Sequence, residues 1–217
     1  MFKIFHTGTT VEFCCFILAI FLLWRDKQIL WRSTIWFLAF VCFTELIAGR
    51  WAARTFHNNI FVYNIYTLFE GGFISFGIYQ CLKKYTNPKK IIISGLVIFY
   101  LTYIAFFITH GIAPYNTWAA SIMTVIFVLY CLYYYYLVIT DEEIIEINKS
   151  PEFWWMTAVL FFYFGSTTGN LFHELFTQII VGGHSIRAHL FVVLNVILYS
   201  LWAYSFICRF KQRRLQS

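Results

Sequence analysis

Apolar residues fall into seven long stretches along this 217-residue chain, separated by short polar segments. A helix that crosses a lipid bilayer needs about 20 mostly apolar residues, with a range of about 17 to 25. All seven stretches fit that range, so the pattern predicts an all-α membrane protein with seven transmembrane helices. The predicted helices cover residues 8–24, 33–53, 60–82, 91–110, 117–139, 153–177 and 186–208.

The polar segments between these stretches are short and contain turn residues. Asn87-Pro88 and Gly182-Gly183 are typical of turns, and Ser150-Pro151-Glu152 is typical of a helix start. The longest polar segment, from Thr140 to Glu152, is too short to hold a soluble module. We therefore expect one domain over residues 1–217. Its first three and last three helices would run in the same directions, although no residue-level repeat supports a duplication.

Basic residues are concentrated in every second gap, and this asymmetry predicts an orientation. Twelve of the 16 lysines and arginines fall in gaps one, three and five and in the tail, against four on the opposite side. Lysine and arginine are enriched in cytoplasmic loops. The pattern predicts an inner (cytoplasmic) membrane protein with its N-terminus outside and its C-terminus in the cytoplasm. The two largest basic groups are Lys83, Lys84, Lys89 and Lys90 in gap three, and Arg209, Lys211, Arg213 and Arg214 in the tail.

Composition excludes several functional classes. The chain is 60% hydrophobic and 12% charged, whereas soluble domains average about 25% charged residues. Its net charge of +6 lies beside the predicted membrane surface, which indicates contact with anionic lipid head groups rather than nucleic acid. No glycine-rich phosphate loop is present. The six cysteines lie in or beside apolar segments, which favours packing over disulfides or metal binding.

The ends of the predicted helices carry many aromatic residues. Trp and Tyr favour the head-group layer, so we expect the following residues to lie at the inner interface: Trp24, Trp31, Trp36, Trp154, Trp155 and residues 133–136. The first apolar run contains Glu12 near its outer end and has no small-residue cleavage site after it. It is therefore expected to stay in the protein as the first helix rather than act as a signal peptide.

Glu70 is the most informative polar residue, because a charged group deep in a membrane is costly. It lies ten residues after Ile60, which is about 15 Å into the third helix at 1.5 Å per residue. Tyr63, Tyr66 and Thr67 precede it at helical spacing, so their hydroxyls are expected to reach its carboxyl. Gly71-Gly72 would allow a neighbouring helix or a ligand to approach closely.

A second polar group lies on the predicted sixth helix. Ser166, Gly169, Asn170, His173 and Thr177 recur at three- and four-residue steps, with Glu174 beside them. Nearly all the intramembrane polar residues lie between the midplane and the outer surface, which predicts an outward-facing polar cavity. The candidate ligand-binding residues are Glu45, Tyr63, Tyr66, Glu70, Asn170, His173, Glu174 and Asn195.

Two other interpretations of these polar residues stay open. Asn64, Asn170 and Asn195 are also typical of hydrogen bonds that tie helices together. A metal-dependent membrane hydrolase is a weaker alternative, because His184 and His189 are five residues apart and no His-Glu-x-x-His motif is present. We predict no catalytic residues, no metal site and no cofactor. The seventh helix has no lysine that could hold retinal.

Several segments resemble an uncharacterised family of multi-pass membrane proteins common in Bacteroidota. The segments are 43–46, 62–66 with Glu70, 151–154, 160–166 and Leu194-Asn195, and the resemblance covers roughly residues 15–210. Members of that family are often associated with sensor histidine kinases, which implies a signalling role. Gly71-Gly72 departs from the bulkier residues expected after Glu70, which implies a reshaped pocket.

The sequence therefore favours a non-enzymatic sensory or signalling module in the membrane. A small or lipid-like ligand would bind in the outer cavity, and helix shifts would act on a membrane signalling partner or a second copy of the chain. A small transporter or ion or proton channel that uses Glu70 is the main alternative. A hydrolase and an inert assembly subunit are the others.

Overall fold

The structure, a computed structural model, describes residues 3–141 and 146–215, and in these ranges it leaves out the side chains of residues 3–7, His173 and Glu174. The fold is all-α, as predicted. The long helices are α1 (Lys3–Leu23), α2 (Ile29–Phe43), α4 (Ile60–Leu82), α5 (Lys89–His110), α6 (Thr117–Thr140), α7 (Pro151–Leu171) and α9 (Ile186–Leu215).

Shorter elements complete the chain. A π-helical turn η1 (Thr44–Ala48) joins α2 to α3 (Gly49–Thr55) in one continuous helix, and η2 (Ile147–Lys149) precedes α7. Between α7 and α9 lie α8 (His173–Gln178) and a small antiparallel hairpin of β1 (Ile180–Val181) and β2 (His184–Ser185).

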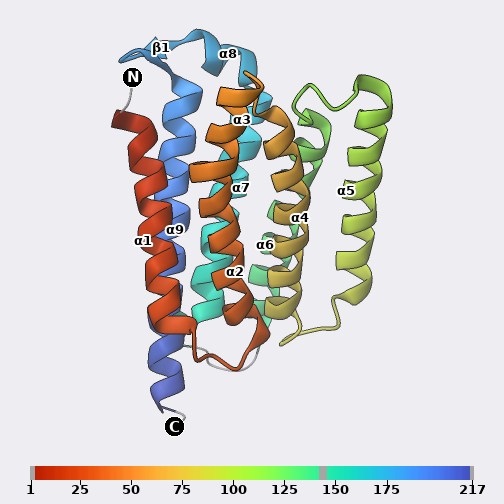
Figure 1. The fold of residues 1–217 in the computed structure, drawn as a ribbon. Helices are drawn as coiled ribbons and strands as arrows, with labels where there is room; N and C mark the ends of the chain where they lie inside the picture. The colour runs from red at the N-terminus through yellow and green to blue at the C-terminus, as the bar shows by residue number, and fades with distance from the viewer. Residues whose placement is uncertain (1–2, 142–145, 216–217) are drawn as a thin grey trace.

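The long helices lie roughly parallel or antiparallel to one another in a single bundle (Figure 1). Helix α9 packs most extensively on α7 and α1, and α6 joins α7 to α5. Helix α4 contacts α2, α5, α6 and α7, so it lies between the two sides of the bundle. Helix α5 lies at the edge, beside α4 and α6 alone among the long helices (Figure 1).

Four described helices are long and apolar enough to cross a membrane: Ile29–Thr55, Lys89–His110, Thr117–Thr140 and Ile186–Leu215. The apolar part of α1, Gly8–Leu23, is shorter. These helices suggest a membrane-embedded protein. Helices α4 and α7 have comparable lengths of 23 and 21 residues but are not among these four. Seven spans and the orientation therefore stay predictions.

Several helix bounds differ from those predicted, and α1 begins at Lys3 rather than at residue 8. The helix predicted over 33–53 begins at Ile29 and contains the π turn. The helix predicted over 153–177 ends at Leu171, because Phe172 leaves the helical conformation at φ −100° and ψ 28°. The helix predicted to end at residue 208 continues to Leu215. Arg209, inside that extension, is held by the turn before α2.

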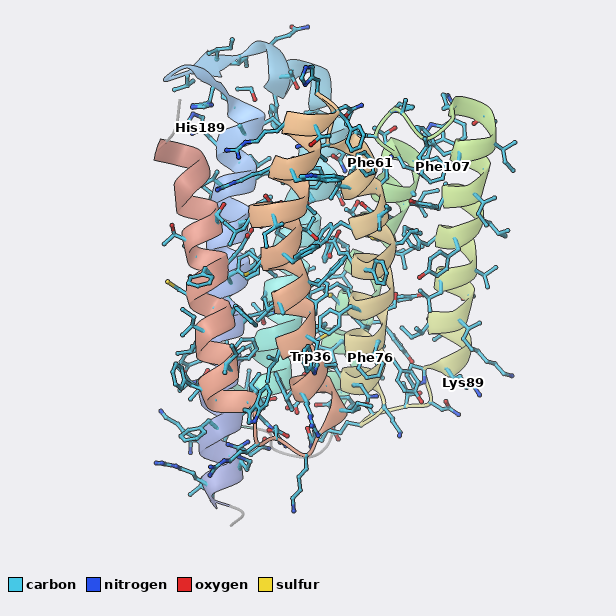
Figure 2. All side chains as sticks on the ribbon, viewed as in Figure 1. Trp36, Phe61, Phe76, Lys89, Phe107 and His189 are labelled. Carbon is cyan, nitrogen blue, oxygen red and sulfur yellow. The ribbon has the colours of Figure 1, made fainter. Side chains whose placement is uncertain are left out.

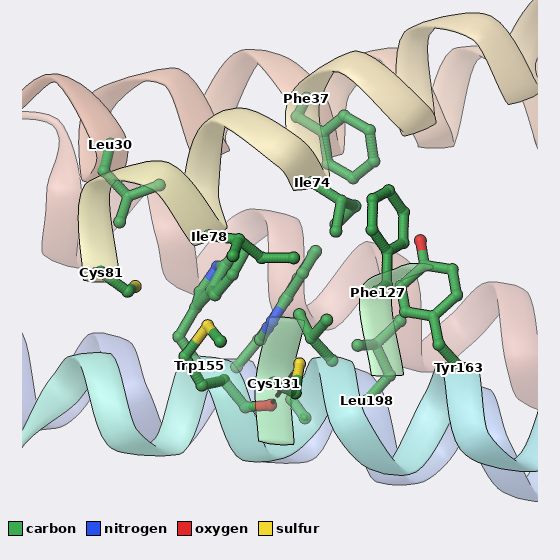
Figure 3. Packing of buried hydrophobic residues seen from close by; sticks show 14 of the residues in the cluster. Leu30, Phe37, Ile74, Ile78, Cys81, Phe127, Cys131, Trp155, Tyr163 and Leu198 are labelled. Atoms are coloured by element: carbon green, nitrogen blue, oxygen red, sulfur yellow. Dashed lines mark hydrogen bonds between the residues drawn. The ribbon is translucent and has the colours of Figure 1, made fainter. Parts of the chain in front are cut away.

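Large aromatic side chains fill the half of the bundle nearest the α4–α5 turn (Figure 3). Trp155 and Trp202 stack with ring centroids 5.7 Å apart, and Trp31 meets the edge of Phe206 at 6.5 Å. Trp31 and Trp155 are fully buried, so the prediction that they lie at the membrane interface is wrong. On α2, Trp31 shares a face with Ile35 and Leu38, which points it inward, whereas Trp36 is exposed.

Candidate functional site

Three carboxyl side chains from three different helical segments lie within electrostatic range of Tyr66 of α4. They are Glu12 of α1, Glu45 of η1 and Glu70 of α4. Glu12 is only 6% exposed, and its Oε2 has no hydrogen-bond partner among the described residues. Glu45 and Glu70 are half-buried. Because acidic groups are expensive to bury without partners, their convergence marks this part of the bundle as a candidate site.

Tyrosine hydroxyls from other elements donate to two of these carboxyls. Tyr163 of α7 donates to Glu70 Oε1 at 2.8 Å, and Tyr63 of α4 donates to Glu45 Oε2 at 3.3 Å. This differs from the prediction that Tyr63 and Thr67 would bind Glu70 along one helix. Thr67 Oγ1 instead donates to the carbonyl of Tyr63 one turn earlier, which is the nearest acceptor on an α-helix.

Two further tyrosines lie among the carboxyls. Tyr66 is within electrostatic range of Glu70, Glu12 and Glu45, and its ring stacks on Phe40 at 6.0 Å. Tyr199 of α9 is buried and lies within range of Glu12, Tyr66 and Glu70. We call the set the acidic tyrosine cluster, and its members are Glu12, Glu45, Glu70, Tyr63, Tyr66, Tyr163 and Tyr199.

The π turn positions the Glu45 end of this cluster. A π-helical turn holds one residue more than an α-helical turn, and such turns are frequent at functional sites. At the end of the turn, a Cβ added to Gly49 would lie 3.2 Å from the hydroxyl of Tyr63. The absence of a side chain at Gly49 therefore lets Tyr63 approach the helix that carries Glu45. On the far side of α4, a Cβ at Gly71 would lie 2.6 Å from Phe99, so α5 is the element that packs closely there.

The candidates from the predicted sixth helix lie apart from the acidic tyrosine cluster. Asn170 accepts a long hydrogen bond of 3.4 Å from Arg187, whose guanidinium lies 5.0 Å above the ring of Phe191. His173 and Glu174 belong to α8, beyond the helix break, and their side chains lie outside the described part of the structure. The continuous polar stripe predicted over residues 166–177 is therefore interrupted after Asn170.

The remaining asparagines have different surroundings. Asn195 is half-buried and lies one helical turn before Tyr199 on α9, on the side that faces the cluster. Asn64 is buried and binds the α5–α6 loop: it donates to the carbonyl of Pro114 at 3.0 Å and accepts from the Asn116 amide at 3.0 Å. Asn116 also caps α6. These bonds match the structural interpretation of Asn64.

Two hollows of the described part of the structure lie away from the acidic tyrosine cluster. One lies along α5 and the other lies at the α4–α5 turn. The outward-facing cavity therefore stays a prediction. No group of three or more His, Cys, Asp or Glu side chains with metal-binding geometry is found in the described ranges 3–141 and 146–215.

Comparison with models of protein families, with curated proteins and with solved structures finds no match to this chain. The candidate site therefore depends on its own geometry. Sequence analysis did not select Glu12, Tyr163 or Tyr199. The spacing of the polar residues could have identified the two tyrosines. Tyr163 lies three residues before Ser166 on the polar face of α7, and Tyr199 lies four residues after Asn195.

Proposed function

We propose that this protein is a seven-span membrane module that binds a small organic cation at the acidic tyrosine cluster and transmits binding through helix movement. Helix length supports this topology: α1, α4 and α7, with 21, 23 and 21 residues, are comparable in length to the four helices that are long and apolar enough to cross a bilayer. Basic residues at the α4–α5 turn and at the end of α9 favour a cytoplasmic position for that end.

The observation that carries the ligand class is the convergence of three carboxyls and four tyrosines. Carboxyl oxygens attract an ammonium group, and the faces of tyrosine rings favour a cation within about 6 Å. Glu12 Oε2, which has no partner among the described residues, is available to such a ligand. Glu45 and Glu70 each use one oxygen on a tyrosine and retain the other.

The opposite half of the bundle favours a sensory module over a channel. It is filled by fully buried aromatic side chains that pack in two pairs, Trp31 with Phe206 and Trp155 with Trp202. A ligand bound at the cluster would shift α1, η1 and α4 relative to this packed half. Such shifts would reach the turns that face a signalling partner, in line with the resemblance to proteins associated with sensor kinases.

Thermal unfolding of the purified protein in detergent tests the ligand class. We expect tetramethylammonium and propylammonium to raise the unfolding temperature, and neutral propanol and anionic propionate to leave it unchanged. Glu70→Gln and Glu12→Gln should each remove the effect, because each removes an attractive carboxyl. Glu146→Gln is the matched control, since Glu146 lies in an exposed pair with Lys149. Equal responses to all four compounds would exclude a cation site.

A second function, proton or cation transport, is favoured by one specific observation. Glu70 lies about 15 Å from the start of α4, near the middle of the bundle, and is bonded to a tyrosine of another helix. Intramembrane carboxyls of this kind occur in proton relays. Flux into liposomes that is lost in Glu70→Gln would favour transport, and the absence of flux by the native protein would exclude it.

A further inference from the structure

A basic hollow lies at the turn between α4 and α5, away from the acidic tyrosine cluster. Its volume is about 580 Å³. Three lysines line it together with a tyrosine from the end of α4 and the turn residues themselves; the lining residues are Tyr79, Lys83, Lys84, Tyr85, Thr86, Asn87 and Lys89. Lys84 also lies over the ring of Tyr85, 5.3 Å from its centroid.

The lysines of this hollow form no ion pair within the described part of the chain, although Asp141 and Glu152 lie within electrostatic range of Tyr85 in its lining. Lys83, Lys84, Lys89 and Lys90 lie within eight residues, and none of them forms an ion pair with a described residue. Four like charges at this spacing repel one another, and an anion between them would relieve that repulsion. The hollow therefore has the charge and the size for an anionic group larger than a simple ion.

A separate, shallow apolar groove lies along α5 and begins one helical turn after Lys89. Its volume is about 270 Å³, and it is lined by Ile93, Leu96, Val97, Tyr100, Leu101 and Ile104. Starting from Lys89, these residues follow one another at three- and four-residue steps, which places them on the same face of α5. Tyr100 is fixed there by a 3.4 Å hydrogen bond to the carbonyl of Leu68 on α4.

The dimensions of the groove match one leaflet of a bilayer. From Ile93 to Ile104 the helix rises about 16 Å at 1.5 Å per residue, and half of a hydrocarbon core of about 30 Å is about 15 Å. Helix α5 lies at the edge of the bundle, where lipid would reach it (Figure 1), and Lys89 lies at its end (Figure 2). A soluble anion would contact the lysines but leave the groove unused.

We propose that the hollow and the groove together form a specific site for one anionic phospholipid. The phosphate group would lie among Lys83, Lys84 and Lys89, and one acyl chain would lie along α5. This site rests on the proposed membrane placement of the bundle but not on the proposed cation ligand. Its occupant would fix the edge helix α5 against α4, which it contacts less extensively than it contacts α6.

Native mass spectrometry of the detergent-purified protein tests the proposal with phosphatidylglycerol, phosphatidylcholine and inorganic phosphate as probes. We expect one tightly retained phosphatidylglycerol and at least tenfold weaker retention of phosphatidylcholine. Phosphate should neither bind tightly nor compete at similar concentration. Competition by phosphate as strong as that by phosphatidylglycerol would overturn the proposal in favour of a soluble-anion site, and equal retention of both lipids would overturn it in favour of non-specific lipid.

The lysines are tested by the triple variant Lys83→Gln, Lys84→Gln and Lys89→Gln. A lysine near an anionic surface contributes roughly fivefold in affinity, so we expect at least a tenfold loss of phosphatidylglycerol affinity. The matched control removes three lysines from the α1–α2 turn, η2 and α9 at the same end of the bundle and should retain the lipid; its substitutions are Lys27→Gln, Lys149→Gln and Lys211→Gln. An equal loss of phosphatidylglycerol affinity in both variants would show that the lipid is bound by the general positive charge of this surface and not by a specific site.

The groove is tested by two adjacent tryptophan substitutions. Val97 lines the groove and Ile98 does not, although the two side chains are 50% and 51% exposed. We expect Val97→Trp to block the acyl chain and weaken binding several-fold, and Ile98→Trp to leave it unchanged. Unchanged binding in Val97→Trp would refute the groove. Circular dichroism checks that each variant is folded. If the triple lysine variant does not fold, the three single lysine variants are measured in its place.

Failure of the lipid site is distinguishable from failure of the membrane placement. A protein that is folded and soluble without detergent would contradict the membrane placement directly. A protein that needs detergent but retains no phosphatidylglycerol would contradict the lipid site alone.

Discussion

Asp26, in the turn between α1 and α2, is the most completely bonded charged residue of the described chain. It accepts two hydrogen bonds from Arg209 of α9, from Nε at 2.8 Å and from Nη2 at 3.0 Å, and a third from the amide of Gln28 at 2.8 Å. Burial alone would raise the pKa of Asp26. The hydrogen bonds from Arg209 and Gln28 and the charges of Arg209 and Arg213 outweigh that effect and hold the pKa below its ordinary 3.8.

We predict that Asp26→Asn destabilises the protein by about 3 kcal/mol at neutral pH, because it leaves the buried Arg209 without its counter-charge. A lowered folded-state pKa means that the contribution of Asp26 is present above pH 3.8 and is lost as the pH falls through that lower value. Unfolding in detergent over a pH series measures both effects. Glu146→Gln, which breaks an exposed pair with Lys149, should change stability by less than about 0.5 kcal/mol. Equal effects of the two substitutions would contradict this interpretation of Asp26.

Individual site residues were predictable only where the signal was local. Glu45 and Glu70 could be selected because an ionisable residue inside an apolar stretch is unusual at any position. Their hydroxyl partners could not be identified, because Tyr163 is 93 residues from Glu70 and 15 tyrosines were available. Glu12 was not selected, because it lies near the predicted outer end of the first helix. Its burial depends on how α1 packs against α9 and α2.

At the scale of elements, the close packing of α4 against α7 depends on Gly77. A Cβ at this position would overlap the ring of Trp155, which is fully buried and stacked on Trp202. The ring cannot move aside easily, because it is fully buried in the core (Figure 3) and stacked on Trp202. The contact therefore requires glycine at residue 77.

We predict that Gly77→Ala lowers the stability of the protein by about 1 to 3 kcal/mol, the usual cost of overpacking a core. Gly8→Ala is the matched control: a Cβ there would meet nothing within 4 Å. Alanine in a helix is favoured over glycine by roughly 0.5 to 1 kcal/mol, so Gly8→Ala should be neutral or stabilising. Thermal unfolding of both variants in detergent measures the difference, and a native-like Gly77→Ala would show that the two helices can separate without cost.

The elements themselves were predictable because lipid-compatible helices require long apolar stretches, and each predicted stretch overlaps a helix. Irregularities within them were not. The π turn Thr44–Ala48 has no breaker residue, and the break at Phe172 follows Gly169 and Asn170 without proline. The π turn lies beside a tertiary contact, that of Gly49 with Tyr63, which the local sequence does not reveal. Likewise, Trp31 and Trp155 could not be assigned to core or interface before the helix rotations were known.

At the scale of the whole molecule, the bundle has two chemically different ends. One end holds the α4–α5 turn and the tail of α9, and the two largest lysine and arginine groups lie there. The half of the bundle next to this end is filled by aromatic side chains. The carboxyls of the acidic tyrosine cluster lie farther from that end, near mid-height. This polarity connects the two proposals: a ligand site in the middle of the bundle, and a lipid site whose lysines face one membrane surface.

That polarity predicts a topology that fusions of reporter domains can measure. Fusions of alkaline phosphatase after Asn87, after Lys149 and at the C-terminus should be inactive, because the basic turns are retained on the cytoplasmic side. Fusions after Pro114 and after Gly183 should be active. Green fluorescent protein at the same positions should give the reciprocal pattern, which controls for expression. Phosphatase activity after Asn87 would contradict the predicted orientation, and equal activity after Asn87 and Pro114 would show that α5, the least buried of the four candidate spans, does not cross the membrane.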